Sequence, residues 1–134
     1  MSVYIDTSAF LTILDADDTN HAVARRVWAE LVERSEAMIT SNYVVVETAA
    51  LLHSRVGVDA VRWLQDDILA VVEVEWVDKP MHASAMSAVI SGARRGPSLV
   101  DCVGFEIIRL RSLAGVFAYD RHFENRGFSL IGQL

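Results

Sequence analysis

Residues 3–14 read VYIDTSAFLTIL, and this stretch indicates the fold class. A short apolar run over residues 3–5 is separated from an apolar-periodic segment over residues 9–14 by Asp6, Thr7 and Ser8. The periodic segment predicts a helix, and Thr7 or Ser8 is expected to be its N-cap. A strand that leads directly into a helix is typical of proteins with a helix-covered parallel sheet.

The same alternation continues along the chain. Apolar residues at helical spacing predict helices over residues 21–33, 43–54, 58–68, 80–90 and 98–110, with a loop over residues 92–97. Short apolar runs predict further strands over residues 37–40, 71–77, 116–119 and 129–131. We therefore expect an α/β fold with a parallel sheet and helices on both faces. The sequence shows no linker or repeat, so residues 1–134 are expected to form a single domain.

Composition excludes several classes of protein. The chain is 52% hydrophobic with a mean hydropathy of +0.29, which is too apolar for a disordered chain. It lacks an apolar run of the roughly 18 residues that a membrane span needs, and its start does not resemble a signal peptide. We expect a cytoplasmic protein with no membrane association. Cys102 is the only cysteine, so a metal site would need oxygen ligands rather than thiolates.

The net charge of -6 argues against a broad basic surface for nucleic acid. Local phosphate contacts remain open, and four arginines close in sequence to acidic residues are candidates for them: Arg94, Arg95, Arg121 and Arg126. The alternative for each is an ordinary solvated surface arginine. His122 is also a candidate RNA contact, but after a strand-end Asp a turn or packing role is more typical, so the predicted catalytic set omits it.

Two acidic residues follow predicted strands directly. Asp6 ends the first strand, and Asp120 ends the strand over residues 116–119. Taken alone, each is explained as a capping or turn residue. In a sheet with this order of elements, however, the first and fourth strands are expected to be neighbours, which places both side chains at the carboxyl edge where ligand sites form.

Glu47 lies in a helix with almost no polar face. Burying an unpaired carboxylate costs several kcal/mol, so Glu47 needs a cleft, a metal or an arginine partner. A structural ion pair with Arg55 or Arg121 is the alternative to a functional role.

Asp101 lies at the start of a helix, in the stretch from Ser98 to Asp101 that fits a capping box. Capping alone could account for both residues. Like Glu47, however, Asp101 is near a helix N-terminus and can point into the crevice with Asp6 and Asp120. Four carboxylates in one crevice would repel one another unless a cation neutralised them, and an all-oxygen site suits Mg²⁺ or Mn²⁺.

Four stretches together resemble the PIN-domain family, most closely the VapC toxins: residues 4–8 (YIDTS), Glu47 early in an apolar helix, residues 98–101 (SLVD) and residues 117–123 (FAYDRHF). The resemblance covers nearly the whole chain. It implies a PIN-like three-layer sandwich with a five-stranded parallel sheet in the order 3-2-1-4-5. It also implies a metal site formed by Asp6, Glu47, Asp101 and Asp120, with Thr7 or Ser8 and Ser98 beside it. Homodimerisation and neutralisation by a cognate VapB-like antitoxin are further implications.

These observations favour an Mg²⁺- or Mn²⁺-dependent endoribonuclease, the toxin of a type II toxin-antitoxin system, that hydrolyses RNA to leave 5′-phosphate ends. A dehalogenase-type phosphotransferase would need a second Asp where Ser8 stands. A receiver domain would need a lysine near its end, where Lys79, the only lysine, does not lie. The remaining alternative is a catalytically silent PIN-like module that binds RNA or a protein partner.

Overall fold

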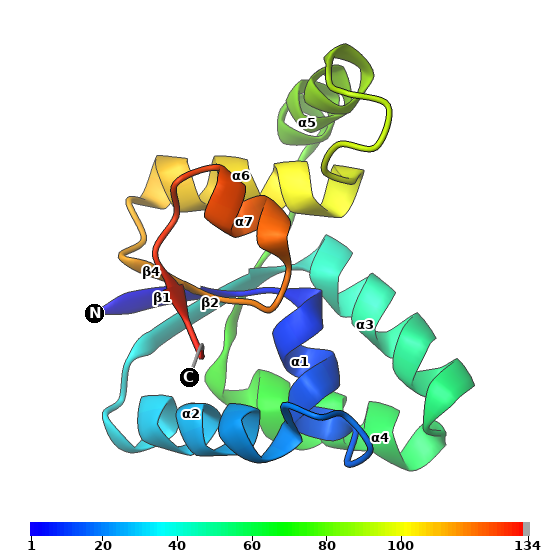
Figure 1. Ribbon diagram of the computed structural model, residues 1–134, viewed down its shortest axis with the longest axis vertical. Helices are drawn as coiled ribbons and strands as arrows, with labels where there is room; N and C mark the ends of the chain where they lie inside the picture. The colour runs from blue at the N-terminus through cyan, green and yellow to red at the C-terminus, as the bar shows by residue number, and fades with distance from the viewer. Residues whose placement is uncertain (133–134) are drawn as a thin grey trace.

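A computed structural model describes residues 1–132 and contains one five-stranded sheet, in the order β3-β2-β1-β4-β5 (Figure 1). The strands are β1 Ser2–Ile5, β2 Ala37–Ser41, β3 Glu73–Glu75, β4 Gly115–Phe117 and β5 Leu130–Ile131. All neighbouring strands pair in parallel. The predicted fold class and sheet order are therefore confirmed.

Helices cover both faces of this sheet. They are α1 Thr7–Leu14, α2 His21–Glu33, α3 Asn42–Arg55, α4 Val58–Trp63, α5 Lys79–Ser91, α6 Leu99–Arg111 and α7 Arg121–Asn125. Figure 1 shows α6 and α7 on one side of the sheet and α1, α2 and α4 on the other, while α5 packs on α6 and projects from the body. Within residues 1–132, no helix is long and apolar enough to cross a lipid bilayer.

Strand β1 is the centre of the core. Val3, Tyr4 and Ile5 are all fully buried, because β1 has a neighbour on each side and helices on both faces. Gly104 of α6 lies directly against the Tyr4 ring: a Cβ at this position would lie 3.0 Å from Tyr4 Cε1. The missing side chain lets α6 approach β1 closely, which brings Asp101, one turn earlier in α6, towards the end of β1.

Three predicted strands are shorter at one or both ends in the structure, and the last of them, predicted over residues 129–131, pairs only over Leu130–Ile131. The strand predicted over residues 71–77 begins only at Glu73, because Leu69–Val71 forms a 3₁₀ turn, and it ends at Glu75, whose partner Ser41 is the last residue of β2. The strand predicted over residues 116–119 ends at Phe117, since its partner Ile5 is the last residue of β1. Parallel strands lose their hydrogen bonds where the neighbour turns away.

Two helical predictions also need correction. The helix predicted over residues 58–68 is α-helical only to Trp63 and continues as a π-helical turn, Leu64–Ile68, and a 3₁₀ turn, Leu69–Val71. Nothing in the structure explains this change of winding. Helix α7 is absent from the sequence prediction, because five residues are too few to show a helical period.

Candidate metal centre

One cleft at the carboxyl edge of the sheet contains all four predicted acids. Its volume is about 380 Å³. The four acids come from the segments that follow β1 and β4 and from the first two turns of helices that begin at that edge, as expected for a site in an open α/β sheet. The lining residues are Asp6, Thr7, Ser8, Leu11, Glu47, Leu51, Gly96, Ser98, Asp101, Asp120 and His122.

Asp6 joins β1 to α1 and is the N-cap of that helix. Its Oδ2 accepts hydrogen bonds from the Ser8 backbone N–H at 3.2 Å and the Ser8 hydroxyl at 2.7 Å. The prediction that Thr7 or Ser8 caps the helix is therefore wrong, because the chain takes helical geometry at Thr7, one residue after the strand. Asp6 also donates its backbone N–H to the Phe117 carbonyl, which holds the ends of β1 and β4 together.

Burial dominates the electrostatics of Asp6. Asp6 is 3% exposed, and the loss of hydration raises the pKa of its carboxyl from 3.8 to about 7, although the hydrogen bonds from Ser8 oppose the shift. The nearby charges of Asp101 and Asp120 raise this pKa further. Asp6 is thus a carboxylate whose ionisation is unfavourable in the metal-free protein.

This shift predicts a pH-dependent stability. Between about pH 4 and pH 7 the folded protein retains a proton on Asp6 that the unfolded chain has lost, so the free energy of unfolding falls as pH rises. The contribution is at most about 1.4 kcal/mol per pH unit. In denaturant unfolding with EDTA, the free energy of unfolding of Asp6→Asn relative to that of the wild type should therefore increase with pH up to about pH 7 and stay constant above it. A difference that does not change with pH would contradict the assignment.

Asp101 combines a capping role with a place in the cleft. Its Oδ2 accepts the Ser98 backbone N–H at 3.0 Å, and the Ser98 hydroxyl accepts the Asp101 N–H at 3.2 Å, so the predicted capping box is confirmed. Burial raises the pKa of the Asp101 carboxyl, and the charge of Asp120 adds to the shift. The capping explanation and a site role therefore coexist.

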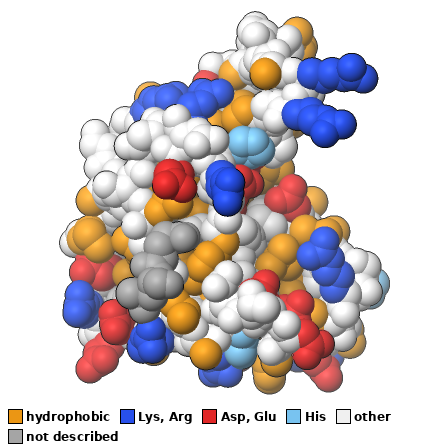
Figure 2. Space-filling view, in the orientation of Figure 1, with side chains coloured by type: hydrophobic (Ala, Val, Ile, Leu, Met, Phe, Trp, Pro, Cys, Tyr) orange, Lys and Arg blue, Asp and Glu red, His pale blue; other side chains and the backbone are white. Residues whose placement is uncertain are grey.

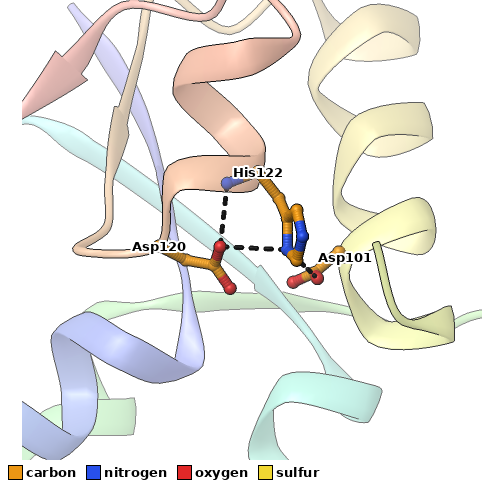
Figure 3. Close-up of side chains that lie close together, drawn as sticks. All are labelled: Asp101, Asp120 and His122. Atoms are coloured by element: carbon orange, nitrogen blue, oxygen red, sulfur yellow. Dashed lines mark hydrogen bonds and ion pairs between the residues drawn. The ribbon is translucent and has the colours of Figure 1, made fainter. Parts of the chain in front are cut away.

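Asp120 follows β4 and caps α7. Its Oδ1 accepts the His122 backbone N–H at 2.8 Å, an arrangement that directs the side chain across the cleft towards Asp101 (Figure 3). The expected neighbourhood of Asp6 and Asp120 is confirmed by the pairing of Ile5 with Phe117, the residues on which β1 and β4 end.

The three aspartates share one feature that suits a cation. In each, a single oxygen accepts the hydrogen bonds that residues 1–132 provide: Oδ2 of Asp6, Oδ2 of Asp101 and Oδ1 of Asp120. The second oxygen of each carboxylate has no such donor among these residues. Carboxylate oxygens are the hard, anionic donors that Mg²⁺ and Mn²⁺ prefer. Among residues 1–132, however, the side chains whose ligand atoms all lie within 4.8 Å of one another are Asp101, Asp120 and His122, and this group does not include Asp6 or Glu47.

Glu47 is half-buried on α3, in the second turn of the helix. Within residues 1–132 neither Arg55 nor Arg121 forms an ion pair with it, so the structural alternative finds no support there. The Glu47 carboxylate is thus available to the cleft.

Thr7, Ser8 and Ser98 all line the cleft as predicted. Ser8 and Ser98 orient Asp6 and Asp101 through the bonds described above. Thr7 is 5% exposed, and its hydroxyl is buried without a hydrogen-bond partner in the described chain. A buried hydroxyl without a partner at the edge of a polar cleft is typical of a group that a ligand or water satisfies.

The four predicted arginines are all exposed, and none lines the cleft. Arg94 and Arg95 lie in the loop between α5 and α6, next to the cleft residue Gly96, and Figure 2 shows basic side chains projecting from that end of the molecule. Arg121 follows Asp120 directly, whereas the Arg126 guanidinium lies over the Phe105 ring at 5.0 Å. Their contacts with RNA stay predictions.

His122 is the cleft residue that the sequence prediction left out. It lies in the first turn of α7, and its Nδ1 is 3.1 Å from Asp120 Oδ1 and 3.3 Å from Asp101 Oδ2 (Figure 3). The signal that could have found it is the spacing from Asp120: in a short helix capped by Asp120, the second helical residue returns towards the cap.

Comparisons with known proteins identify the family of the chain. Residues 3–128 match the family model of the PIN domain. The chain is 31% identical over 127 residues to the 23S rRNA-specific endonuclease VapC20 of Mycobacterium tuberculosis, an alignment that covers 94% of this chain and 95% of that protein. Over 57 residues it is 44% identical to ribonuclease VapC26 of the same organism, which covers 42% of this chain and 39% of that protein.

Solved structures give the same result. The crystal structure of M. tuberculosis VapC20, described as a sarcin-ricin loop cleaving toxin, matches with a TM-score of 0.82 at 29% identity, over 94% of this chain and 95% of that one. FitAcB from Neisseria gonorrhoeae matches with a TM-score of 0.68 at 16% identity, over 96% of both chains, and shares the fold. The resemblance to VapC toxins is confirmed, and the chain belongs to the PIN-domain family.

Proposed function

We propose that this protein is a VapC-type toxin, an endoribonuclease that hydrolyses RNA phosphodiesters with the help of Mg²⁺ or Mn²⁺ and leaves 5′-phosphate ends. The observation that carries the proposal is the set of three aspartates in one cleft, each with one oxygen fixed by the protein and one free. The likeness to VapC20 over nearly the whole chain supports the reaction class.

The residues divide the work as follows. Asp6, Asp101 and Asp120 hold the cation, which when bound provides Lewis-acid stabilisation of the attacked phosphate. One oxygen of each aspartate is held by a hydrogen bond, from Ser8, from Ser98 or from the backbone N–H of His122. These bonds orient the second oxygen of each carboxylate before substrate binds. Glu47, which has no ion-pair partner in the described chain, accepts a proton from the attacking water or orients it.

A catalytically silent binding module fits these observations less well. In such a protein the acids would serve only as capping or salt-bridge groups. Asp6, Asp101 and Asp120 do cap helices, but within residues 1–132 no Arg or Lys forms an ion pair with any of the four acids. His122 is the basic side chain of the described chain that lies against this cluster, within 3.3 Å of Asp101 and Asp120. Burial raises the pKa of Asp6 and Asp101, so full ionisation of all the acids would be favoured by a bound cation.

The substrate we propose is cellular RNA, with ribosomal RNA the first to test because VapC20 is specific for 23S rRNA. The proposed setting is the cytoplasm, where such RNA is found. Arg94 and Arg95 are the proposed contacts for RNA phosphates, because both are exposed in the loop beside the cleft residue Gly96.

The proposed protein partner is a small VapB-like antitoxin. An apolar groove of about 370 Å³ between α2 and the region after α4 supports it, because Trp28 and Trp63 both line the groove and Trp63 is 57% exposed. Copurification from the native host should yield a small partner, and its absence under conditions of normal expression would count against this part of the proposal.

A homodimer is proposed as well. Apolar side chains remain exposed on and beside the α5–α6 pair, where Trp76 and Ile90 are each 77% exposed and Leu110 is 73% exposed. Exposed large apolar groups of this kind commonly mark protein interfaces. Sedimentation of the purified chain tests this directly.

The proposed activity is tested by incubating purified protein with total RNA in Mn²⁺ and in EDTA. The key variant is Asp101→Asn, because its side-chain oxygen can still accept the Ser98 N–H while the charge is lost. Asp66→Asn, at an exposed position outside the cleft, is the matched control. We expect cleavage only with metal, and only in the wild type and the control. Equal RNA patterns in every reaction would favour the binding module.

A further inference from the structure

We propose that His122 is a ligand of the cation, so that Asp101, Asp120 and His122 form a mixed carboxylate–imidazole site that takes Mn²⁺ in preference to Mg²⁺. The inference rests on the proposed function and extends it to a residue outside the four acids. Among residues 1–132, this is the group of His, Cys, Asp and Glu side chains whose ligand atoms all lie within 4.8 Å of one another.

The distances match those between neighbouring ligands of one ion. His122 Nδ1 lies 3.1 Å from Asp120 Oδ1 and 3.3 Å from Asp101 Oδ2. Adjacent ligands at about 2.1 Å from an octahedral ion are separated by about 3 Å. Asp120 Oδ1 and Asp101 Oδ2 are the hydrogen-bonded oxygens of the carboxylates, not the free ones. An oxygen that accepts one hydrogen bond keeps a second lone pair, so each carboxylate can offer the ion this oxygen as well as its free one.

The state of Nδ1 also indicates a missing partner. The atom is buried and has no hydrogen-bond partner in the described chain, although it faces two carboxylates (Figure 3). In the tautomer with its proton on Nε2, the ring presents the Nδ1 lone pair to both carboxylates, an arrangement that a shared cation would stabilise.

The fold fixes the ring in this position. The Asp120 carboxylate caps α7 through the His122 N–H, and the next residue, Phe123, is fully buried in the core. His122 is therefore held on both sides along the chain. Its side chain is 35% exposed, so the site is open to ion entry.

The chemistry then predicts a preference among metals. Imidazole nitrogen suits borderline transition ions, whereas Mg²⁺ favours oxygen ligands and retains its waters. Loss of the nitrogen should weaken Mn²⁺ binding about tenfold or more and leave Mg²⁺ binding much less affected.

The experiment is Mn²⁺ electron paramagnetic resonance on the full chain, with a titration for affinity and spin-echo envelope modulation for ¹⁴N coupling. We expect histidine ¹⁴N coupling in the wild type and in the control His53→Gln, whose exposed ring lies outside the cleft. We expect none in His122→Gln. Circular dichroism checks folding of the variants, and the wild-type spectrum tests the proposal independently of them.

The outcomes separate this inference from the proposed function. Mn²⁺ that binds to the wild type, is lost in Asp101→Asn and shows no ¹⁴N coupling would overturn the role of His122 and leave the metal-dependent nuclease intact. A wild-type chain that binds no Mn²⁺ would overturn both. Coupling that persists in His122→Gln would assign the nitrogen to another residue and refute the proposal.

Discussion

Asp6→Asn is expected to abolish RNA cleavage while making the metal-free protein more stable. The variant removes a charge that the cation requires, and a loss of about 10³-fold in rate corresponds to about 4 kcal/mol of transition-state stabilisation. At about pH 8 the same change removes an ionised carboxyl that is 3% exposed, so the free energy of unfolding should rise by about 1–3 kcal/mol. Asn retains the cap, since its side-chain oxygen can accept both bonds from Ser8.

The measurement pairs cleavage rates in Mn²⁺ with denaturant unfolding in EDTA, and Asp66→Asn again provides the control at an exposed position. Asp6→Asn should lose activity and gain stability, whereas Asp66→Asn should change neither. If Asp6→Asn were inactive because it is less stable than the wild type, Asp6 would be a structural residue and the site assignment would lose its main support.

Phe123→Ala is expected to cost about 3–4 kcal/mol of stability and to loosen the site. Phe123 is fully buried on α7, with its ring 5.0 Å from that of Phe105 and 6.3 Å from those of Tyr4 and Phe128. These rings are the main attachment of a five-residue helix that would not persist alone. Because α7 carries His122 and is capped by Asp120, Mn²⁺ affinity should fall along with stability.

Phe123→Leu is the matched variant, because it retains most of the apolar volume and should cost less than about 1.5 kcal/mol. Hydrogen exchange of the α7 amides distinguishes local loosening from global unfolding. If denaturant curves gave Phe123→Ala a free energy of unfolding within about 1 kcal/mol of the wild-type value, the aromatic contacts would not be what holds α7 in place.

The sheet could be predicted because the clearest patterns in the sequence are the apolar residues that the core buries. Residues 3–5 are uniformly apolar because β1 is buried on both faces. Helix α2 buries one side only, and this one-sided burial produces the helical period that predicts a helix over residues 21–33. Strand ends were less predictable, since Glu75 and Phe117 end their strands for a reason outside their own segments, namely where β2 and β1 turn away.

The four acids could be chosen from sequence because each lies at a strand end or a helix start, and parallel topology brings those positions to one edge. The sequence does not show which oxygen of each carboxylate is hydrogen-bonded and which is free, because this depends on how side chains such as those of Asp6 and Ser8 are oriented. His122 was missed for a related reason. Its place in the cleft depends on α7, a helix too short to have a sequence period.

The most direct test of the proposed reaction is to map the ends of RNA fragments produced by the purified protein in Mn²⁺. Metal-assisted attack by water on the phosphate does not use the RNA 2′-hydroxyl, so the fragments should carry 5′-phosphate and 3′-hydroxyl ends. Fragments that end instead in 2′,3′-cyclic phosphates and 5′-hydroxyls, formed equally in EDTA, would show a metal-free reaction and contradict the role given to Asp6, Glu47, Asp101 and Asp120.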